Sequence, residues 1–174
     1  DAAISKIGKN GTLLLPTFNW DFCSGKDFDY LNTPSRSGSL TKVALSRSEF
    51  KRTKNPIYSF AVYGKEQNYL FNLAHENSFD LNSPFGFLIK NKGKNLFIDI
   101  DYKDSLTFVH VAEQKIGVNY RYIKKFSANY IDESKHKKLV DYSMYVRKEE
   151  FQGATFIDEK MDLILQEKNA IKSV

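Results

Sequence analysis

Short apolar runs alternate with amphipathic segments along the whole of this chain. The apolar runs predict buried strands, and apolar side chains spaced three or four positions apart predict helices. Expected strands are residues 13–15, 57–63, 96–100, 120–127 and 138–146, and expected helices are 2–7, 40–46, 65–74, 85–89 and 156–171. This alternation predicts an α/β protein, a three-layer sandwich around a mixed, mostly parallel sheet with the last two strands as antiparallel additions.

Size and composition favour one cytoplasmic domain. The chain has 174 residues, enough for one good core. No apolar run approaches the roughly 20 residues that span a bilayer, so we expect no membrane segment. The single Cys23 excludes an internal disulfide framework and fits a reducing compartment. Three histidines and one cysteine, scattered along the chain, show no metal-ligand spacing.

The net charge of +5 does not by itself indicate a nucleic-acid partner. The basic clusters at 47–54, 90–94 and 135–138 are short, separated and mixed with polar residues. A nucleic-acid surface would group such residues on one face with exposed aromatic side chains. We expect solvated loops and no nucleic-acid binding, although the first cluster also suits the phosphates of an anionic small ligand.

Local signals predict several loops and helix caps. Residues 17–38 are irregular but rich in aromatic residues, which predicts an ordered lid or binding loop rather than disorder. Ser39 is expected to cap the helix at 40–46. Ser83 is expected to cap the helix at 85–89, with Pro84 at its first position.

A polar pair follows the expected strand at 96–100. His110 and Glu113 are three positions apart, so a helix places them on one face, one turn from each other. A polar pair on the helix after a strand is a frequent way to build an enzyme site. The alternative is structural, with His110 packed under the sheet and bonded to a backbone carbonyl, and Glu113 exposed.

Several motifs occur in a recognisable order. They are GTLLLPTFNWDFC, the TPSxxGxL pattern at 33–40, NPIYSFAVYGK, NSPFGFL and TFVHVAEQKIGVNYR. Together they resemble the antibiotic N-acetyltransferase family, named for the aminoglycoside 3-N-acetyltransferases, over residues 1–146. The family is longer at its N-terminus, so the resemblance implies a single acetyltransferase-like domain, 1–174, that lacks its N-terminal portion. A strand expected within the first fifteen residues agrees with this. The segments YSFAVYG and NYRYIKKF are more similar to family members from bacterial surface-sugar gene clusters than to the drug-resistance enzymes.

The resemblance implies transfer of an acetyl group from acetyl-CoA to the amine of an amino sugar. The acceptor would be an aminoglycoside or a nucleotide-linked surface-glycan precursor, and the protein could be a homodimer. Such a reaction needs a base for the amine proton and hydrogen-bond donors for the developing oxyanion. His110 matches the family's TFxHxxE motif and is the expected base. Glu113 is expected to orient His110 or to bind the amine.

The resemblance also supplies binding residues, each with a simpler alternative. Four are expected to contact the amino sugar (Asp21, Asn55, Tyr58 and Asn82) and four to contact the cofactor (Ser35, Arg52, Ser59 and Ser83). The serines are equally consistent with turns or caps. Asp21 is also consistent with loop solvation, and Arg52 with surface charge. Cys23 is expected to pack rather than to react.

Two departures from the family pattern bear on catalysis. The resistance enzymes carry His-Pro where this chain has Asn55-Pro56, and an acidic residue just before the Ser-Pro where this chain has Asn82. An asparagine side chain cannot act as a base at neutral pH. Three interpretations stay open. In the first, His110 and Glu113 take over the catalytic role. In the second, the missing N-terminal segment supplies a catalytic group. In the third, the chain is a non-catalytic relative that binds sugar or CoA.

Overall fold

The computed structural model describes residues 1–151 and 159–172. One small sheet contains β1 (Thr12–Pro16), β4 (Phe60–Gly64) and β3 (Lys51–Arg52), in the order β1-β4-β3. Both pairings are antiparallel, and Leu14 lies opposite Val62. The apolar run that begins at Leu13 forms β1, and the Leu14 side chain packs against the aromatic core.

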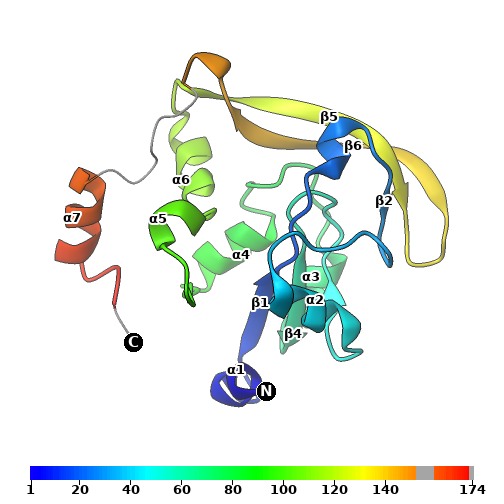
Figure 1. The fold of residues 1–174 in the computed structure, drawn as a ribbon, viewed down its shortest axis with the longest axis horizontal. Coiled ribbons are helices and arrows are strands. Elements are labelled where there is room, and N and C mark those ends of the chain that lie inside the picture. Colours follow the sequence, from blue (N-terminus) through cyan, green and yellow to red (C-terminus); the bar gives the residue numbers. More distant parts are fainter. Residues whose placement is uncertain (152–158, 173–174) are drawn as a thin grey trace.

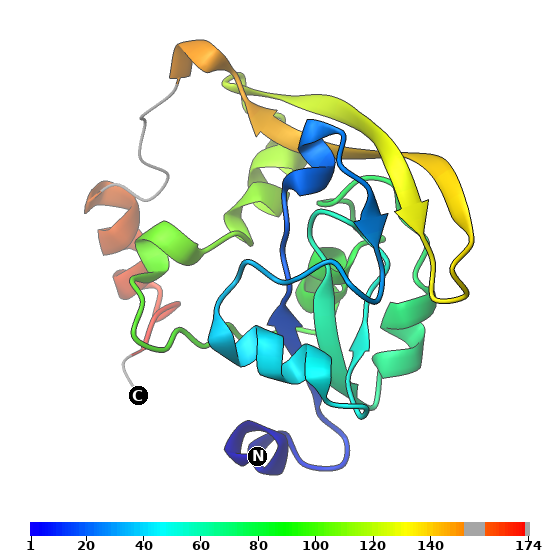
Figure 2. The same cartoon turned by 45° about the vertical axis from the view of Figure 1, so that its right-hand side comes forward.

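A second sheet contains β2 (Phe28–Asp29), β5 (Arg121–Ile131) and β6 (Lys137–Arg147), in that order. β5 and β6 form a long antiparallel hairpin that arches over the rest of the molecule in Figure 1. Figure 2 shows the short β2 beside β5, and this pair is parallel.

The expectation of a mostly parallel sheet is wrong for the residues the structure describes. Among them β2 and β5 are the only paired strands that run parallel, and the strands belong to two sheets rather than one. Parallel neighbours need a crossover connection of a dozen or more residues, whereas β5 and β6 are joined by a short turn. The fold is mixed α/β, and the three-layer sandwich is not confirmed.

Except for the short α5, which the sequence did not predict, the helices lie close to where the sequence places them. They are α1 (Ala2–Ile7), α2 (Ser39–Ser46), α3 (Gln67–Asn72), α4 (Pro84–Lys90), α5 (Tyr102–Ser105), α6 (Val109–Ile116) and α7 (Glu159–Glu167). Of the helix expected at 156–171, residues 156–158 lie outside the described residues. Within the part of the chain that the structure describes, no helix is both long and apolar enough to cross a membrane.

One of the two expected caps is confirmed. The Ser83 hydroxyl accepts a hydrogen bond from the Gly86 N–H at 3.3 Å, and Pro84 opens α4. The cap expected at Ser39 is wrong. Gly38 takes the N-cap position, with no side-chain cap bond, and Ser39 is already the first helical residue. Gly38 has φ of 107°, a backbone conformation that disfavours any other residue.

The strand expected at 96–100 is also wrong. These residues form no strand, and Leu96, Ile98 and Ile100 are 69%, 67% and 58% exposed. Asp99 has φ of 55°, which interrupts an extended backbone. An apolar run becomes a strand only when a neighbouring strand satisfies its backbone groups, and no described strand does so here.

The core is unusually aromatic and lies between the two sheets. Phe18 contacts Tyr58 at a ring-centroid distance of 4.8 Å, and Tyr58 contacts Phe79 at 4.9 Å. The segment 17–38 contributes buried Phe22 and Phe28 to this core, so the expectation that it is ordered is confirmed. Its role as a lid or binding loop stays a prediction.

Candidate active site

α6 and the start of β5 hold a buried polar cluster around Glu113. Nδ1 of His110 lies 2.6 Å from Glu113 Oε2, as the spacing on one helix face predicts. The Tyr120 hydroxyl donates to Glu113 Oε1 at 2.8 Å, and Arg121 Nε lies 2.8 Å from Oε2 in an ion pair. Glu113 is therefore buried, not exposed, so the alternative of an exposed helix glutamate is wrong.

The partners of Glu113 keep it ionised. Burial acts to raise its pKa, but the hydrogen bonds from His110 and Tyr120 and the charge of Arg121 outweigh burial and lower the pKa. An ionised carboxylate only accepts hydrogen bonds. The ring nitrogen of His110 that faces this carboxylate, Nδ1, is therefore the one that carries a hydrogen, and Nε2 is the opposite ring nitrogen.

Asn55 is at the centre of a second buried cluster. It is 0% exposed, and its Oδ1 accepts the backbone N–H groups of Ile57 and Tyr58 at 2.9 and 2.8 Å. These bonds fix the amide orientation, so Nδ2 faces Ser78 Oγ at 3.3 Å and His75 Nε2 at 3.4 Å. The Asn55 side chain therefore stabilises the turn at the start of the NPIYSFAVYGK motif.

His75 is a site neighbour that sequence reasoning missed. Its Nδ1 lies 3.3 Å from the carbonyl oxygen of Leu73, which can only accept, so Nδ1 carries the hydrogen. Burial lowers the pKa of His75, which keeps the ring neutral at pH 7. No motif surrounds this histidine in the sequence, and it meets Asn55 only because the chain folds back after α3.

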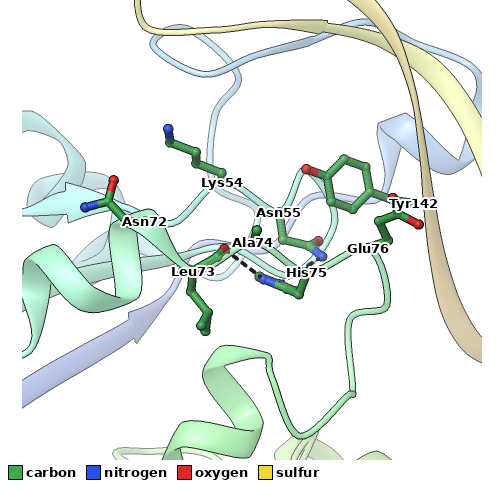
Figure 3. Close-up of a pocket in the computed structure, with 8 residues that line it drawn as sticks. All are labelled: Lys54, Asn55, Asn72, Leu73, Ala74, His75, Glu76 and Tyr142. Atoms are coloured by element: carbon green, nitrogen blue, oxygen red, sulfur yellow. Dashed lines mark hydrogen bonds between the residues drawn. The ribbon is translucent and has the colours of Figure 1, made fainter.

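A pocket of about 270 Å³ opens beside this cluster (Figure 3). Its wall comes from the turn at 54–55, the segment 72–76 that begins at the last residue of α3, and one side chain of β6. The lining residues are Lys54, Asn55, Asn72, Leu73, Ala74, His75, Glu76 and Tyr142. His110 and Glu113 are not among them. The structure therefore brings the expected catalytic pair together, and brings Asn55 to a pocket, but in two separate clusters.

Arg52 forms the centre of a third buried polar group. Its Nε donates to Ser59 Oγ at 3.0 Å, and its two terminal nitrogens donate to the carbonyls of Thr33 and Thr17. The guanidinium also lies 4.8 Å from the ring centroid of Phe28. Arg52 is 4% exposed, so its interpretation as surface charge is wrong. Burial lowers its pKa to about 10, which still leaves it protonated at pH 7.

The other expected binding residues occupy varied positions. Ser35 is buried and its hydroxyl lies 2.7 Å from Thr41 Oγ1, while Ser83 caps α4. Asp21 pairs with Arg36 at 2.9 Å, which lowers the pKa of the carboxyl. Tyr58 lies in the aromatic core, and Asn82 is exposed. Their contacts with a sugar or cofactor stay predictions.

The fold is that of aminoglycoside acetyltransferases of known structure. A structure of AAC-VIa bound to sisomicin has a TM-score of 0.75 at 18% identity and covers 100% of this chain and 72% of that one. A structure of AAC-IIIb with CoASH has a TM-score of 0.72 at 18% identity and covers 94% and 67%. The structure of YokD from Bacillus subtilis has a TM-score of 0.69 at 25% identity and covers 86% and 66%.

Sequence comparison agrees with the fold. The SPbeta prophage-derived aminoglycoside N(3')-acetyltransferase-like protein YokD of Bacillus subtilis (strain 168) is 32% identical over 139 residues, which are 66% of this chain and 50% of that protein. The chain thus matches only half the length of this relative. The family model for aminoglycoside 3-N-acetyltransferase matches residues 1–167. The chain belongs to this family, and the resemblance seen in its motifs is confirmed.

Proposed function

We propose that the protein transfers an acetyl group from acetyl-CoA to the amine of an amino sugar. The observation that carries this proposal is the family match over residues 1–167. Acetyl-CoA is the co-substrate that membership of the family implies, and a structural neighbour with CoASH supports it. A neighbour bound to sisomicin supports an amino-sugar acceptor. We propose neither a membrane nor a nucleic-acid partner for this reaction.

The chemistry asks little of the protein, because the thioester is already activated. The acceptor amine attacks the thioester carbonyl carbon, the carbon–sulfur bond breaks, and the amine proton must go to a base while the CoA sulfur finally gains a proton. His110 is the proposed base. Glu113 holds Nδ1–H of His110 at 2.6 Å and so presents Nε2 for proton transfer. Tyr120 and Arg121 in turn hold Glu113 in place.

The acceptor is either an aminoglycoside or a nucleotide-linked amino sugar of a surface glycan. Acetyl-CoA turnover by the protein, followed as CoA thiol release with acceptors of both kinds, tests the reaction and chooses between them. Calorimetry that detects no CoA binding would refute the proposal. Sedimentation analysis of the same samples tests whether the protein is a homodimer. Fractionation of cells tests whether it is located in the cytoplasm.

The role of His110 has its own test. His110→Ala should lower kcat by about 10² to 10⁴, the usual contribution of a general base. His136→Ala is the matched control, because His136 is exposed at the turn between β5 and β6. Full activity in His110→Ala would remove the base role and leave the reaction class untouched.

A second candidate is a non-catalytic relative that binds sugar or CoA without turnover. It is favoured by Asn55, a residue that cannot accept a proton and whose side chain is fully committed to the turn that it stabilises. Under this candidate, acetyl-CoA and an amino sugar bind but no product forms. New activity in Asn55→His would support it, and product formation by the unaltered protein would exclude it.

A further inference from the structure

The pocket beside Asn55 has a rigid, uncharged floor. The Asn55 amide is held by two backbone N–H groups, and the His75 ring is held between the Leu73 carbonyl and Asn55. Burial keeps His75 neutral. A floor with fixed side chains and no charge gives a pocket a constant shape and leaves the selection by charge to the groups at its rim.

The rim carries charges of both signs on opposite sides. Figure 3 shows Glu76 beside Tyr142, with Lys54 and Asn72 on the far side of the floor. Glu76 is exposed, and its charge acts with burial to raise the pKa of the Tyr142 phenol, so the two groups are close neighbours. The Lys54 ammonium lies 3.2 Å from Glu133, which offsets its positive charge. The carboxylate of Glu76 is therefore the charge that a cationic ligand would meet.

The apolar part of the lining suits the carbon face of a sugar. The Tyr142 ring and the Leu73 side chain both line the pocket, and Tyr142 is held in place by an edge contact with Phe22 at 5.9 Å. An aromatic ring can stack on the C–H face of a sugar while its hydroxyl and neighbouring amides meet sugar hydroxyl groups. A volume of about 270 Å³ suits one such ring rather than a whole oligosaccharide.

We infer that this pocket binds one amino-sugar ring of the acceptor, with its ammonium group against Glu76 and its carbon face on Tyr142. The inference rests on the proposed function and adds a binding site for one ring of the acceptor; His110 does not line this pocket, so the amine that is acetylated lies elsewhere on the acceptor. Neither Glu76 nor Tyr142 belongs to the motifs that led to the family. At the opposite side, where the ring carries hydroxyl groups, the Lys54 ammonium can donate hydrogen bonds and the Asn72 amide can both donate and accept them.

Glu76→Gln tests the inference, because it removes the charge and keeps the shape of an exposed side chain. The control is Glu150→Gln, since Glu150 is exposed in the 3₁₀ turn Glu149–Phe151 and does not line the pocket. The probes are glucosamine, glucose and N-acetylglucosamine, titrated into the protein by calorimetry and NMR without acetyl-CoA. The unaltered protein should bind glucosamine more tightly than both uncharged sugars.

Glu76→Gln should weaken glucosamine binding about tenfold, or about 1.4 kcal/mol, and abolish the preference over glucose. With sisomicin as acceptor, KM for sisomicin should rise by a similar factor while kcat and KM for acetyl-CoA stay within twofold. No preference for glucosamine in the unaltered protein, or an equal effect of Glu150→Gln, would overturn the inference.

The two proposals fail in different ways. Glucosamine binding that depends on Glu76, without any acetyl transfer, would refute the proposed function and keep the pocket. Acetyl transfer with an unchanged sisomicin KM in Glu76→Gln would refute the pocket and keep the function.

Discussion

Replacing Glu113 by glutamine should destabilise the protein strongly. The side chain keeps its volume but loses its charge, and Arg121 remains buried with its ion pair broken. Removing one partner of a buried ion pair costs about 3–5 kcal/mol. Glutamine can still accept the Tyr120 hydroxyl, which compensates part of the loss, so we expect the free energy of unfolding to fall by about 3 kcal/mol.

The stability that Glu113→Gln loses should depend on pH in a defined direction. The pKa of Glu113 lies below its ordinary value of 4.5 in the folded protein. Its contribution to stability is therefore fully present above about pH 4.5 and is lost as the pH falls through the folded-state pKa. Below that pKa the protonated carboxyl resembles the glutamine amide, so the difference between the two proteins should close.

Urea unfolding at pH 7 and at a series of lower pH values measures both effects. Glu150→Gln is the control, because an exposed substitution of this kind should change stability by less than about 0.5 kcal/mol. A loss in Glu113→Gln below about 1 kcal/mol at pH 7, or a loss that does not shrink toward low pH, would contradict the view that Glu113 is an ionised, buried partner of Arg121.

Three further substitutions test the local architecture by urea unfolding. Asn55→Ala leaves two buried backbone N–H groups without an acceptor and should cost about 3 kcal/mol; a cost under about 1 kcal/mol would show that water replaces the amide. Gly86→Ala should cost about 2 kcal/mol, because a Cβ there would lie 2.2 Å from the Leu81 carbonyl oxygen, and unchanged stability would mean that α4 shifts freely. Ser83→Ala removes the cap of α4 and the hydrogen bond that the Ser83 hydroxyl donates to the Asp80 carbonyl, and should cost about 1.5 kcal/mol, so a larger loss than that of Gly86→Ala would be inconsistent with this role.

Most helices and the long hairpin could be predicted because their signals are local. The alternating residues of 138–146 lie within β6, and the Ser83-Pro84 pair marks the start of α4. The error at 96–100 has a physical cause, since an apolar run specifies a tendency to be extended but not a partner strand. Strand direction was also not predictable, because the pairing of β1 with β4 joins segments far apart in the chain.

The candidate site likewise contains one contact that a local sequence pattern predicts and others that form only when the whole chain folds. The contact between His110 and Glu113 follows from spacing on one helix turn, so the sequence predicts it. The partners Tyr120 and Arg121 lie after the turn at Gly117, whose φ of 73° ends α6. Whether that turn directs β5 back onto Glu113 depends on how the hairpin packs, and no local pattern reports this.

The sequence by itself determined the family, the helix that carries His110 and Glu113, and the aromatic character of the core. The tertiary structure alone decided that Glu113 is buried against Arg121, that Arg52 lies inside the molecule, and that His75 meets Asn55 beside a pocket. The reason is the range of the interactions. Helical spacing and capping act over a few residues, whereas burial and charge pairing depend on segments that meet only when the whole chain has folded.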